Sequence, residues 1–418
     1  SNIFNMKSKL LFISIFFSLC LFSQTSKIIS GPMVSYIDAR TTQVWMLVDQ
    51  SVKIIQIDLV DYDNNKTLDF IHNVTNPYFF QDYIPVTVPL ESLKPNTEYI
   101  MTVSIDGNEY EKSFDIYTSR PYLDDTHFLI GGDISNLNSK SDEIFNSMTE
   151  MKSDFMIWTG DNLLSNSFNN KFSFKSLSND YISTRLNSSL NNFLQSTPQI
   201  ATWSNLDFPN FNSSENLKDT SYYVFDLFWP NSLKKTYNYT FMDYGLYQKY
   251  SYNDIDVFLL DTRSFREEPS LNSSLLGNNQ MERIFEEINK NGATFTFIVS
   301  PSPFLFKGSE SMINYSKHLN EFLNRLKTSN VEGVILLSSQ GLKTSFVKLD
   351  KSSNLIESKY WSPVYEFNLG SIAGPGQQNF SRIKVEGELD ERVCIIETFN
   401  EKGEVLFEKR IHEDQLKY

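Results

Sequence analysis

Carboxylate and amide side chains stand where several apolar runs of this chain give way to polar or glycine-containing turns. Asp133 and the pair Asp161-Asn162 each follow an apolar run, and Asp207 lies in a polar stretch after Trp203. Oxygen atoms of these types are the ligands that Ca²⁺ and Mg²⁺ prefer. The four side chains are therefore candidates for a low-affinity hard-cation site, or else for solvated side chains that hold no ligand.

Imidazole and thiol groups, which transition metals prefer, are scarce, because the chain has 4 His and 2 Cys. We expect each histidine to be a surface or capping residue; they are His72, His127, His318 and His412. Cys394 lies in the strand-like run 392–396, where we expect a buried structural thiol. The other cysteine, Cys20, lies in an apolar segment near the start of the chain.

The elements that must position the candidate residues alternate between strands and helices from residue 121 onward. Buried strands are predicted at 128–132, 155–158, 257–260, 295–299 and 334–337, and helices between them include 280–290 and 316–327. Ligands bind beyond the carboxyl ends of the strands in such α/β folds. We therefore expect Asp133, Asp161 and Asp207 to converge at one edge of a sheet. Two strand-like runs, 392–398 and 404–411, are expected to complete this domain.

The first 120 residues have a different organisation. Residues 1–24 have the basic start and short apolar run of a secretory signal peptide, and the run is shorter than the ~20 residues that span a bilayer. Leu19 stands where a lipoprotein signal has a small residue, which argues against a lipid on Cys20. Residues 25–120 show short strands and turns, and Leu93, Pro95 and Tyr99 resemble the corner of fibronectin type III modules, so we predict a β-sandwich.

Composition limits the classes of partner. The 418 residues carry 37 Lys and Arg against 51 Asp and Glu, a net charge of −14. This balance argues against a nucleic-acid binder or a protein that binds anionic membranes, because both need positive surface potential. We also expect no transmembrane segment after the leader.

An ordered set of segments resembles the alkaline phosphatase D family of metallophosphoesterases. The segments are Gly31 to Tyr36, Trp158 to Asn162, Trp203 to Phe208, Leu260 to Arg266, Leu276 to Gln280 and Ser338 to Leu342. The resemblance implies a fibronectin-like sandwich at 25–120, followed over 121–418 by a four-layer α/β sandwich of the metallophosphoesterase type. It also implies phosphoester hydrolysis by two close cations that activate a water molecule.

Several ligand positions of that family hold other residues here. Asp161 and Asn162 match the segment with the bridging carboxylate, and Asp207 matches a second acidic position. Asp133 stands where the family has a metal-binding Cys, and Leu164 where it has a Tyr. The resemblance implies Asp at the positions of Ser204, Asn205 and Gln340, His at those of Leu206 and Leu342, and Gly at that of Ser339. A leucine side chain offers no donor atom to a metal.

These departures favour a pseudoenzyme, so we expect no catalytic residue and no cofactor. The expected remnant of the pocket consists of Asp133, Asp161, Asn162, Asp207, Gln340 and Arg263. We expect Arg263 and Arg266 to form ion pairs with Asp261 or Glu267. The protein would be exported to the periplasm or the outer membrane of a Gram-negative bacterium and bind protein partners there. The alternative is an active phosphatase or phosphodiesterase that uses Ca²⁺ or Mg²⁺ through Asp133, Asp161, Asn162 and Asp207.

Overall fold

The computed structural model describes residues 27–120, 122–164, 173–208, 215–231, 245–288, 290–339, 341–350 and 363–417. The predicted leader at 1–24, which includes Cys20, lies outside the described residues, and so does Gln340.

The N-terminal part is a β-sandwich of two antiparallel sheets. One sheet has the order β1-β2-β5, and the other has the order β4-β3-β6-β7 with β8 beside β6. The strands are β1 (Ile28–Val34), β2 (Thr42–Asp49), β3 (Ile54–Asp61), β4 (Thr67–Asn73), β5 (Tyr83–Leu90), β6 (Glu98–Ile105), β7 (Asn108–Glu109) and β8 (Phe114–Tyr117). The Tyr99 hydroxyl accepts a hydrogen bond from the Lys94 amide at 2.9 Å. This tyrosine corner agrees with the predicted fibronectin-like sandwich.

The remainder of the chain is built on two six-stranded sheets. The first has the order β11-β10-β9-β18-β19-β20, and the second has the order β12-β13-β14-β15-β17-β16. The first contains β9 (Thr126–Gly131), β10 (Phe155–Thr159), β11 (Gln199–Thr202), β18 (Phe380–Glu386), β19 (Val393–Phe399) and β20 (Val405–His412). The second contains β12 (Gln248–Tyr252), β13 (Ile255–Leu259), β14 (Phe295–Ser300), β15 (Val334–Ser338), β16 (Ser345–Leu349) and β17 (Val364–Asn368). As predicted, the C-terminal strands complete the first sheet.

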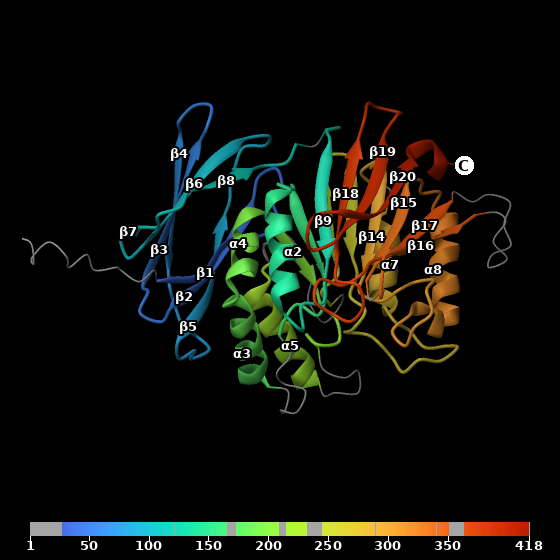
Figure 1. Cartoon of the computed structure of the whole chain (residues 1–418), viewed down its shortest axis with the longest axis horizontal. Helices are drawn as coiled ribbons and strands as arrows, with labels where there is room; N and C mark the ends of the chain where they lie inside the picture. The colour runs from blue at the N-terminus through green and yellow to red at the C-terminus, as the bar shows by residue number, and fades with distance from the viewer. Residues whose placement is uncertain are drawn as a thin grey trace, which may run out of the picture.

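The two sheets form the inner layers of a four-layer α/β/β/α sandwich (Figure 1). Apolar side chains between the sheets, among them Phe128, Phe297 and Cys394, form one core cluster. The outer helices are α2 (Ser139–Glu150), α3 (Phe174–Arg185), α4 (Ser188–Ser196) and α5 (Glu215–Phe228) on one side, and α7 (Asn278–Glu287) and α8 (Ser316–Thr328) on the other. Short 3-10 turns lie at Met312–Asn314 and Glu413–Leu416. The predicted metallophosphoesterase-like α/β architecture is confirmed.

Local sequence explains where the helices of the first outer layer begin. The Asn138 side chain accepts from the amides of Lys140 and Ser141 and so caps α2. Ser173 caps α3 in the same manner, and Asn187 caps α4. Side-chain acceptors at these positions satisfy amides that have no partner inside the helix. None of the helices among the described residues is both long and apolar enough to cross a membrane.

The sandwich shares a hydrophobic core with this helical layer. Met33, Trp45 and Leu47 belong to the same buried cluster as side chains of α2 to α5. The Trp45 indole donates a hydrogen bond to the Leu227 carbonyl at 2.7 Å. The Arg185 guanidinium lies 5.1 Å from the Trp45 ring centre, on a helix of the other unit. The two units are therefore joined by buried contacts.

Candidate functional site

Three strand ends bring the predicted acidic residues to one edge of the first sheet. Asp133 follows β9, Asp161 follows β10 and Asp207 follows β11, and these strands are parallel neighbours. The Asp133 amide donates to the Gly160 carbonyl at 2.9 Å, which joins the first two turns. Asp133 and Asp161 both have positive φ, 56° and 55°, in a region that Asp tolerates better than most residues.

Asp207 is the hydrogen-bond centre of this edge. Its carboxylate is fully buried and accepts from four donors, which are the amides of Asp161 (2.7 Å), Asn162 (3.2 Å) and Ser204 (2.9 Å) and the hydroxyl of Tyr181 (2.7 Å). Four donors match the roughly four lone-pair sites of a carboxylate. Asp207 therefore joins its own turn, after β11, to the turn after β10, and it has little capacity left for a cation.

Asp161 is covered by the turn that follows β11. Its Oδ1 accepts the Leu206 amide at 2.9 Å, and the Asn205 amide, turned so that its nitrogen faces Asp161, donates to the two oxygens at 3.1 and 3.2 Å. Burial, together with repulsion from Asp207 and Asp133, raises the pKa of Asp161 to about 7. Near neutral pH this carboxyl exists as a mixture of its neutral and ionised forms.

Asp133 lies against a separate segment of the chain. Its Oδ1 accepts the Ser135 hydroxyl at 2.6 Å, and its backbone carbonyl accepts the Ala373 amide at 2.8 Å. A Cβ added to Gly374 would lie 1.7 Å from Asp133 Oδ2, so only glycine allows this close approach. The turn after β17 therefore packs directly on this carboxylate.

Asn162 has a buried side-chain oxygen that no described residue uses. Its Nδ2 donates to the Thr202 carbonyl at 2.7 Å, and the side chain is fully buried. Its Oδ1 accepts no hydrogen bond from the described residues. A buried amide oxygen without a donor is uncommon and could face a cation or a water molecule.

The two arginines make a different ion pair from the predicted one. Arg263 and Arg266 both contact one oxygen of Glu310, at 2.5 and 2.6 Å. The prediction that they pair with Asp261 or Glu267 is wrong. The Asp261 carboxylate already accepts the Trp203 indole at 2.8 Å and backbone amides around it, so it has no room for a guanidinium. The Arg263, Arg266 and Glu310 side chains place two cationic groups and one acidic group beside the candidate site.

Leu206, Leu342 and Gln340 stand at three positions where the resemblance implies metal ligands. Leu206 is partly exposed beside Asp161, Leu342 is 67% exposed, and Gln340 lies outside the described residues.

The histidines lie on β4, β9, the first turn of α8 and the end of β20, away from Asp161 and its neighbours. His318 is buried, which corrects the expectation of a surface or capping residue there, because the helix packs its first turn against Ser274.

Two residues of this region were not identified from the sequence. Tyr181 on α3 donates to Asp207, and Glu366 on β17 is a fully buried acid. Glu366 accepts the Ser338 hydroxyl at 2.6 Å and the amides of Phe304 and Leu305, and burial raises its pKa to about 7. The signal for Glu366 was an acid between apolar neighbours, in the run Val364 to Phe367, because a buried carboxyl must be satisfied with donors.

The donor set does not fit a two-cation clamp. Asp207 is saturated by protein donors, and Asp161 is covered by Asn205 and Leu206. Among the described residues, no group of three or more His, Cys, Asp and Glu side chains is arranged to hold a metal ion.

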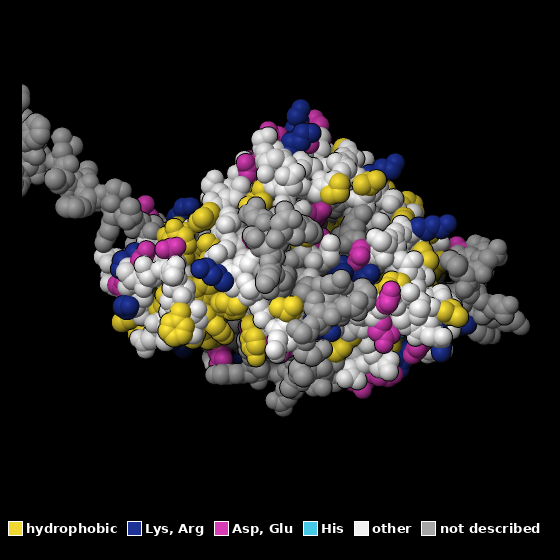
Figure 2. Space-filling view, turned by 90° about the horizontal axis from the view of Figure 1, so that it is seen from below, with side chains coloured by type: hydrophobic (Ala, Val, Ile, Leu, Met, Phe, Trp, Pro, Cys, Tyr) yellow, Lys and Arg dark blue, Asp and Glu magenta, His cyan; other side chains and the backbone are white. Residues whose placement is uncertain are grey.

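In Figure 2 the acidic and basic side chains on the lower face are interspersed, and hydrophobic side chains gather toward the sandwich end.

Comparison with known proteins supports the fold. No protein-family model matches the chain, and no curated protein sequence matches it. A solved structure described as "Structure of PhoD" has a TM-score of 0.75 and 14% identity, over 94% of this chain and 91% of that one. GAP50, the anchor in the inner membrane complex of Plasmodium, has a TM-score of 0.40 and 12% identity over 69% of this chain and 89% of that one. A predicted phosphoesterase from Streptococcus pneumoniae has a TM-score of 0.28 and 11% identity over 69% of this chain and 99% of that one.

The agreement with PhoD extends over nearly the whole of both chains, and it includes the sandwich as well as the four-layer body. At 14% identity the likeness concerns the fold and not the chemistry. The chain therefore has the fold of PhoD, with a fibronectin-like sandwich joined to a metallophosphoesterase-like α/β sandwich.

Proposed function

We propose that this protein is a PhoD-like pseudoenzyme that binds partners and does not hydrolyse phosphoesters. The observation that carries the proposal is the turn Ser204 to Asp207. This turn directs its own donors at Asp161, and its Asp207 carboxylate accepts the amides of Asp161 and Asn162 from the turn after β10 and that of Ser204 from its own turn. A hydrolase needs open oxygen ligands for two cations, whereas here Asp207 accepts protein donors and Asp161 is covered by Asn205 and Leu206.

The test is turnover of a phosphomonoester and a phosphodiester by the purified mature protein. p-Nitrophenyl phosphate and its bis-ester are supplied with Ca²⁺, Mg²⁺, Mn²⁺, Zn²⁺ or iron in turn. We expect no turnover above buffer with any of them. Turnover by the wild type that is lost in Asp161→Ala would contradict the proposal, whereas activity that persists in that variant would come from a contaminant.

The buried Oδ1 of Asn162 favours a second candidate function. With Asp161 and Asp133 it offers hard oxygen atoms at neighbouring strand ends, and one Ca²⁺ or Mg²⁺ could be held there with low affinity. A hydrolase with this reduced site should bind a cation when Ca²⁺ or Mg²⁺ is supplied in excess. Calorimetric titration of Ca²⁺ into wild type and Asn162→Leu separates the two candidates, because only a true site loses binding in the variant.

The setting of the proposed binding role is the cell envelope of a Gram-negative bacterium, in the periplasm or at the outer membrane. The support is the composition of residues 1–24 and the acidic, aromatic-rich chain. Cell fractionation with a C-terminal tag tests the location. Crosslinking in intact cells, followed by mass spectrometry, tests for a protein partner. Recovery in the cytoplasmic fraction, or a monomer without crosslinks, would contradict this setting.

A further inference from the structure

Three consecutive aromatic residues lie in the loop between β4 and β5 of the sandwich. They are Tyr78, Phe79 and Phe80, and residues 74–81 around them carry no charged side chain. Phe79 is 88% exposed, more than any other large hydrophobic side chain of the described residues, and Tyr78 is 42% exposed. The loop therefore presents an uncharged aromatic surface to the surroundings of the protein.

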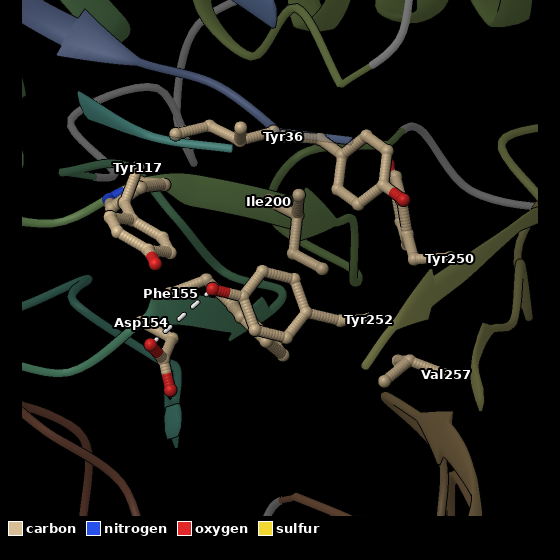
Figure 3. A pocket seen from close by; sticks show the side chains of 10 residues that line it. Tyr36, Tyr117, Asp154, Phe155, Ile200, Tyr250, Tyr252 and Val257 are labelled. Carbon is tan, nitrogen blue, oxygen red and sulfur yellow. Dashed lines mark hydrogen bonds between the residues drawn. The ribbon is translucent and has the colours of Figure 1, made fainter. Parts of the chain in front are cut away.

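Aromatic side chains elsewhere on the sandwich are covered by the chain itself. Where the sandwich meets the α/β body, the ring centre of Tyr36 lies 4.4 Å from that of Tyr250 (Figure 3). In the same view, the Tyr252 hydroxyl donates to Asp154 at 3.3 Å. Within the part of the chain that the structure describes, no ring is paired in this way with Phe79.

The conformation of the loop is fixed before anything binds to it. The Asn76 side chain accepts the Phe80 amide at 2.8 Å and donates to the Phe80 carbonyl at 2.6 Å. The Phe174 ring, at the start of α3, lies 5.2 Å from that of Tyr78 and 5.8 Å from that of Phe80. Phe79 is held between them at a φ of 55°, which is unfavourable for a bulky side chain. Strain that the surrounding contacts maintain at an exposed position points to a function.

Several backbone groups at the tip of the loop are bonded within the chain. The Phe79 amide donates to the Asn76 carbonyl at 3.3 Å, Pro77 has no amide hydrogen, and both polar groups of Phe80 are bonded to the Asn76 side chain. A segment that enters the interface of a bilayer loses water, so its backbone groups need partners within the protein. The lack of charged side chains at 74–81 removes the other large cost of this transfer.

We propose that this loop docks on a zwitterionic lipid bilayer, with the Phe79 ring in the interfacial region and Tyr78 at the level of the headgroups. Aromatic side chains favour this region of a membrane. The exposed parts of Phe79 and Tyr78 offer roughly 200–300 Å², whereas a standard protein interface buries about 800 Å² per partner, so the patch suits lipid better than a protein. The net charge of −14 disfavours anionic lipids. This inference does not depend on the proposed function.

The test is cosedimentation of the full mature chain with vesicles of phosphatidylcholine and phosphatidylethanolamine. We expect reversible binding with a partition constant of at most on the order of 10⁴ M⁻¹, which is the value for a single myristoyl chain. Salt should leave this binding unchanged, and replacing part of the lipid with phosphatidylglycerol should weaken it, because the headgroups then repel the acidic chain. No binding to the neutral vesicles, or tighter binding to the anionic ones, would overturn the proposal.

Phe79→Gly assigns the binding to the loop, because glycine adopts the φ of 55° without strain. We expect it to bind at least about tenfold more weakly than the wild type. Its melting temperature should stay close to that of the wild type, because the relief of strain offsets the greater freedom of glycine in the unfolded chain. Tyr62→Ala is the matched control, since Tyr62 is 62% exposed in the turn at the other end of β4. A large fall in the melting temperature of Phe79→Gly, or an equal loss of binding in Tyr62→Ala, would refute the assignment.

Phe79→Trp distinguishes a lipid from a protein as the occupant. We expect vesicles with bromine on the lipid acyl chains to quench the emission of this variant more strongly than that of the wild type, because the added indole enters the bilayer. Quenching no greater than that of the wild type would overturn the proposal. A crosslink from position 79 to an envelope protein, formed without lipid, would assign the loop to a protein instead.

Discussion

Replacing Asp161 with asparagine is expected to make the protein more stable at neutral and alkaline pH. Burial and repulsion from Asp207 and Asp133 raise the pKa of Asp161 to about 7, against an ordinary value of 3.8. Between these two values the folded chain binds a proton that the unfolded chain releases. The wild-type free energy of unfolding therefore falls as the pH rises through this range. Asparagine cannot ionise, and it tolerates the positive φ of 55° at this position.

The magnitude follows from the two pKa values. At about 1.4 kcal/mol for each pH unit, the interval from 3.8 to about 7 corresponds to at most roughly 4 kcal/mol above neutral pH. Because Asp207 titrates together with Asp161, we expect roughly 2–3 kcal/mol as the measured gain between about pH 4.5 and about pH 8. This gain is a large part of a typical domain stability of about 5–15 kcal/mol.

Urea unfolding of wild type and Asp161→Asn at the two pH values measures this gain by linear extrapolation. A difference between the proteins that stays constant with pH would refute the reasoning, because it would not arise from ionisation. Millimolar Ca²⁺ gives a second comparison at about pH 8. If Ca²⁺ raises the free energy of unfolding more in the wild type than in Asp161→Asn, the result would favour the one-cation site of Asn162, Asp161 and Asp133 over the pseudoenzyme.

Three further substitutions probe other contacts. Asp207→Ala should lower the free energy of unfolding by about 3–5 kcal/mol in urea titration, because it leaves four buried donors without an acceptor; a loss below about 1 kcal/mol would contradict its structural role. Tyr99→Phe should cost about 1 kcal/mol by removing the corner hydrogen bond, and its thermal transition should stay single; a second transition would show that the sandwich unfolds alone. Glu310→Gln should cost about 2–3 kcal/mol at low salt by leaving its two arginine partners without a counter-charge, and an unchanged melting temperature would exclude this.

The fold could be predicted well where apolar runs are long and turns are distinct. The predicted strand 155–158 is β10, Phe155–Thr159, and the predicted helix 316–327 is α8, Ser316–Thr328. The ordered set of segments that resembles the alkaline phosphatase D family then predicted the four-layer architecture. Strand β17 was missed because Glu366 interrupts its apolar run, and β11 has only four residues and begins at Gln199. Helices α3 and α4 were missed because they are rich in Ser and Asn, whose helix propensity is low.

The position of the candidate site in the fold could be predicted, but not which of its oxygen atoms already accept hydrogen bonds. Residues at the ends of parallel neighbouring strands must meet, so the convergence of Asp133, Asp161 and Asp207 followed from the strand order. The use of the Asp207 carboxylate could not be predicted, because three of its donors are backbone amides and the fourth comes from a helix that was not identified. Sequence patterns indicate which groups come near each other, whereas geometry decides which oxygen is already occupied.

The shared core between the sandwich and the helical layer has a consequence for biosynthesis. Trp45 is fully buried, but its hydrogen-bond acceptor, the Leu227 carbonyl, is 182 residues further along the chain. Translation produces the sandwich first, at about 5–20 residues per second, so the face with Trp45 has no cover for roughly ten seconds or more. During this interval the nascent chain exposes an apolar surface that a chaperone can recognise. The order of synthesis thus makes residues 215–228 the segment whose arrival ends the vulnerable period of the N-terminal unit.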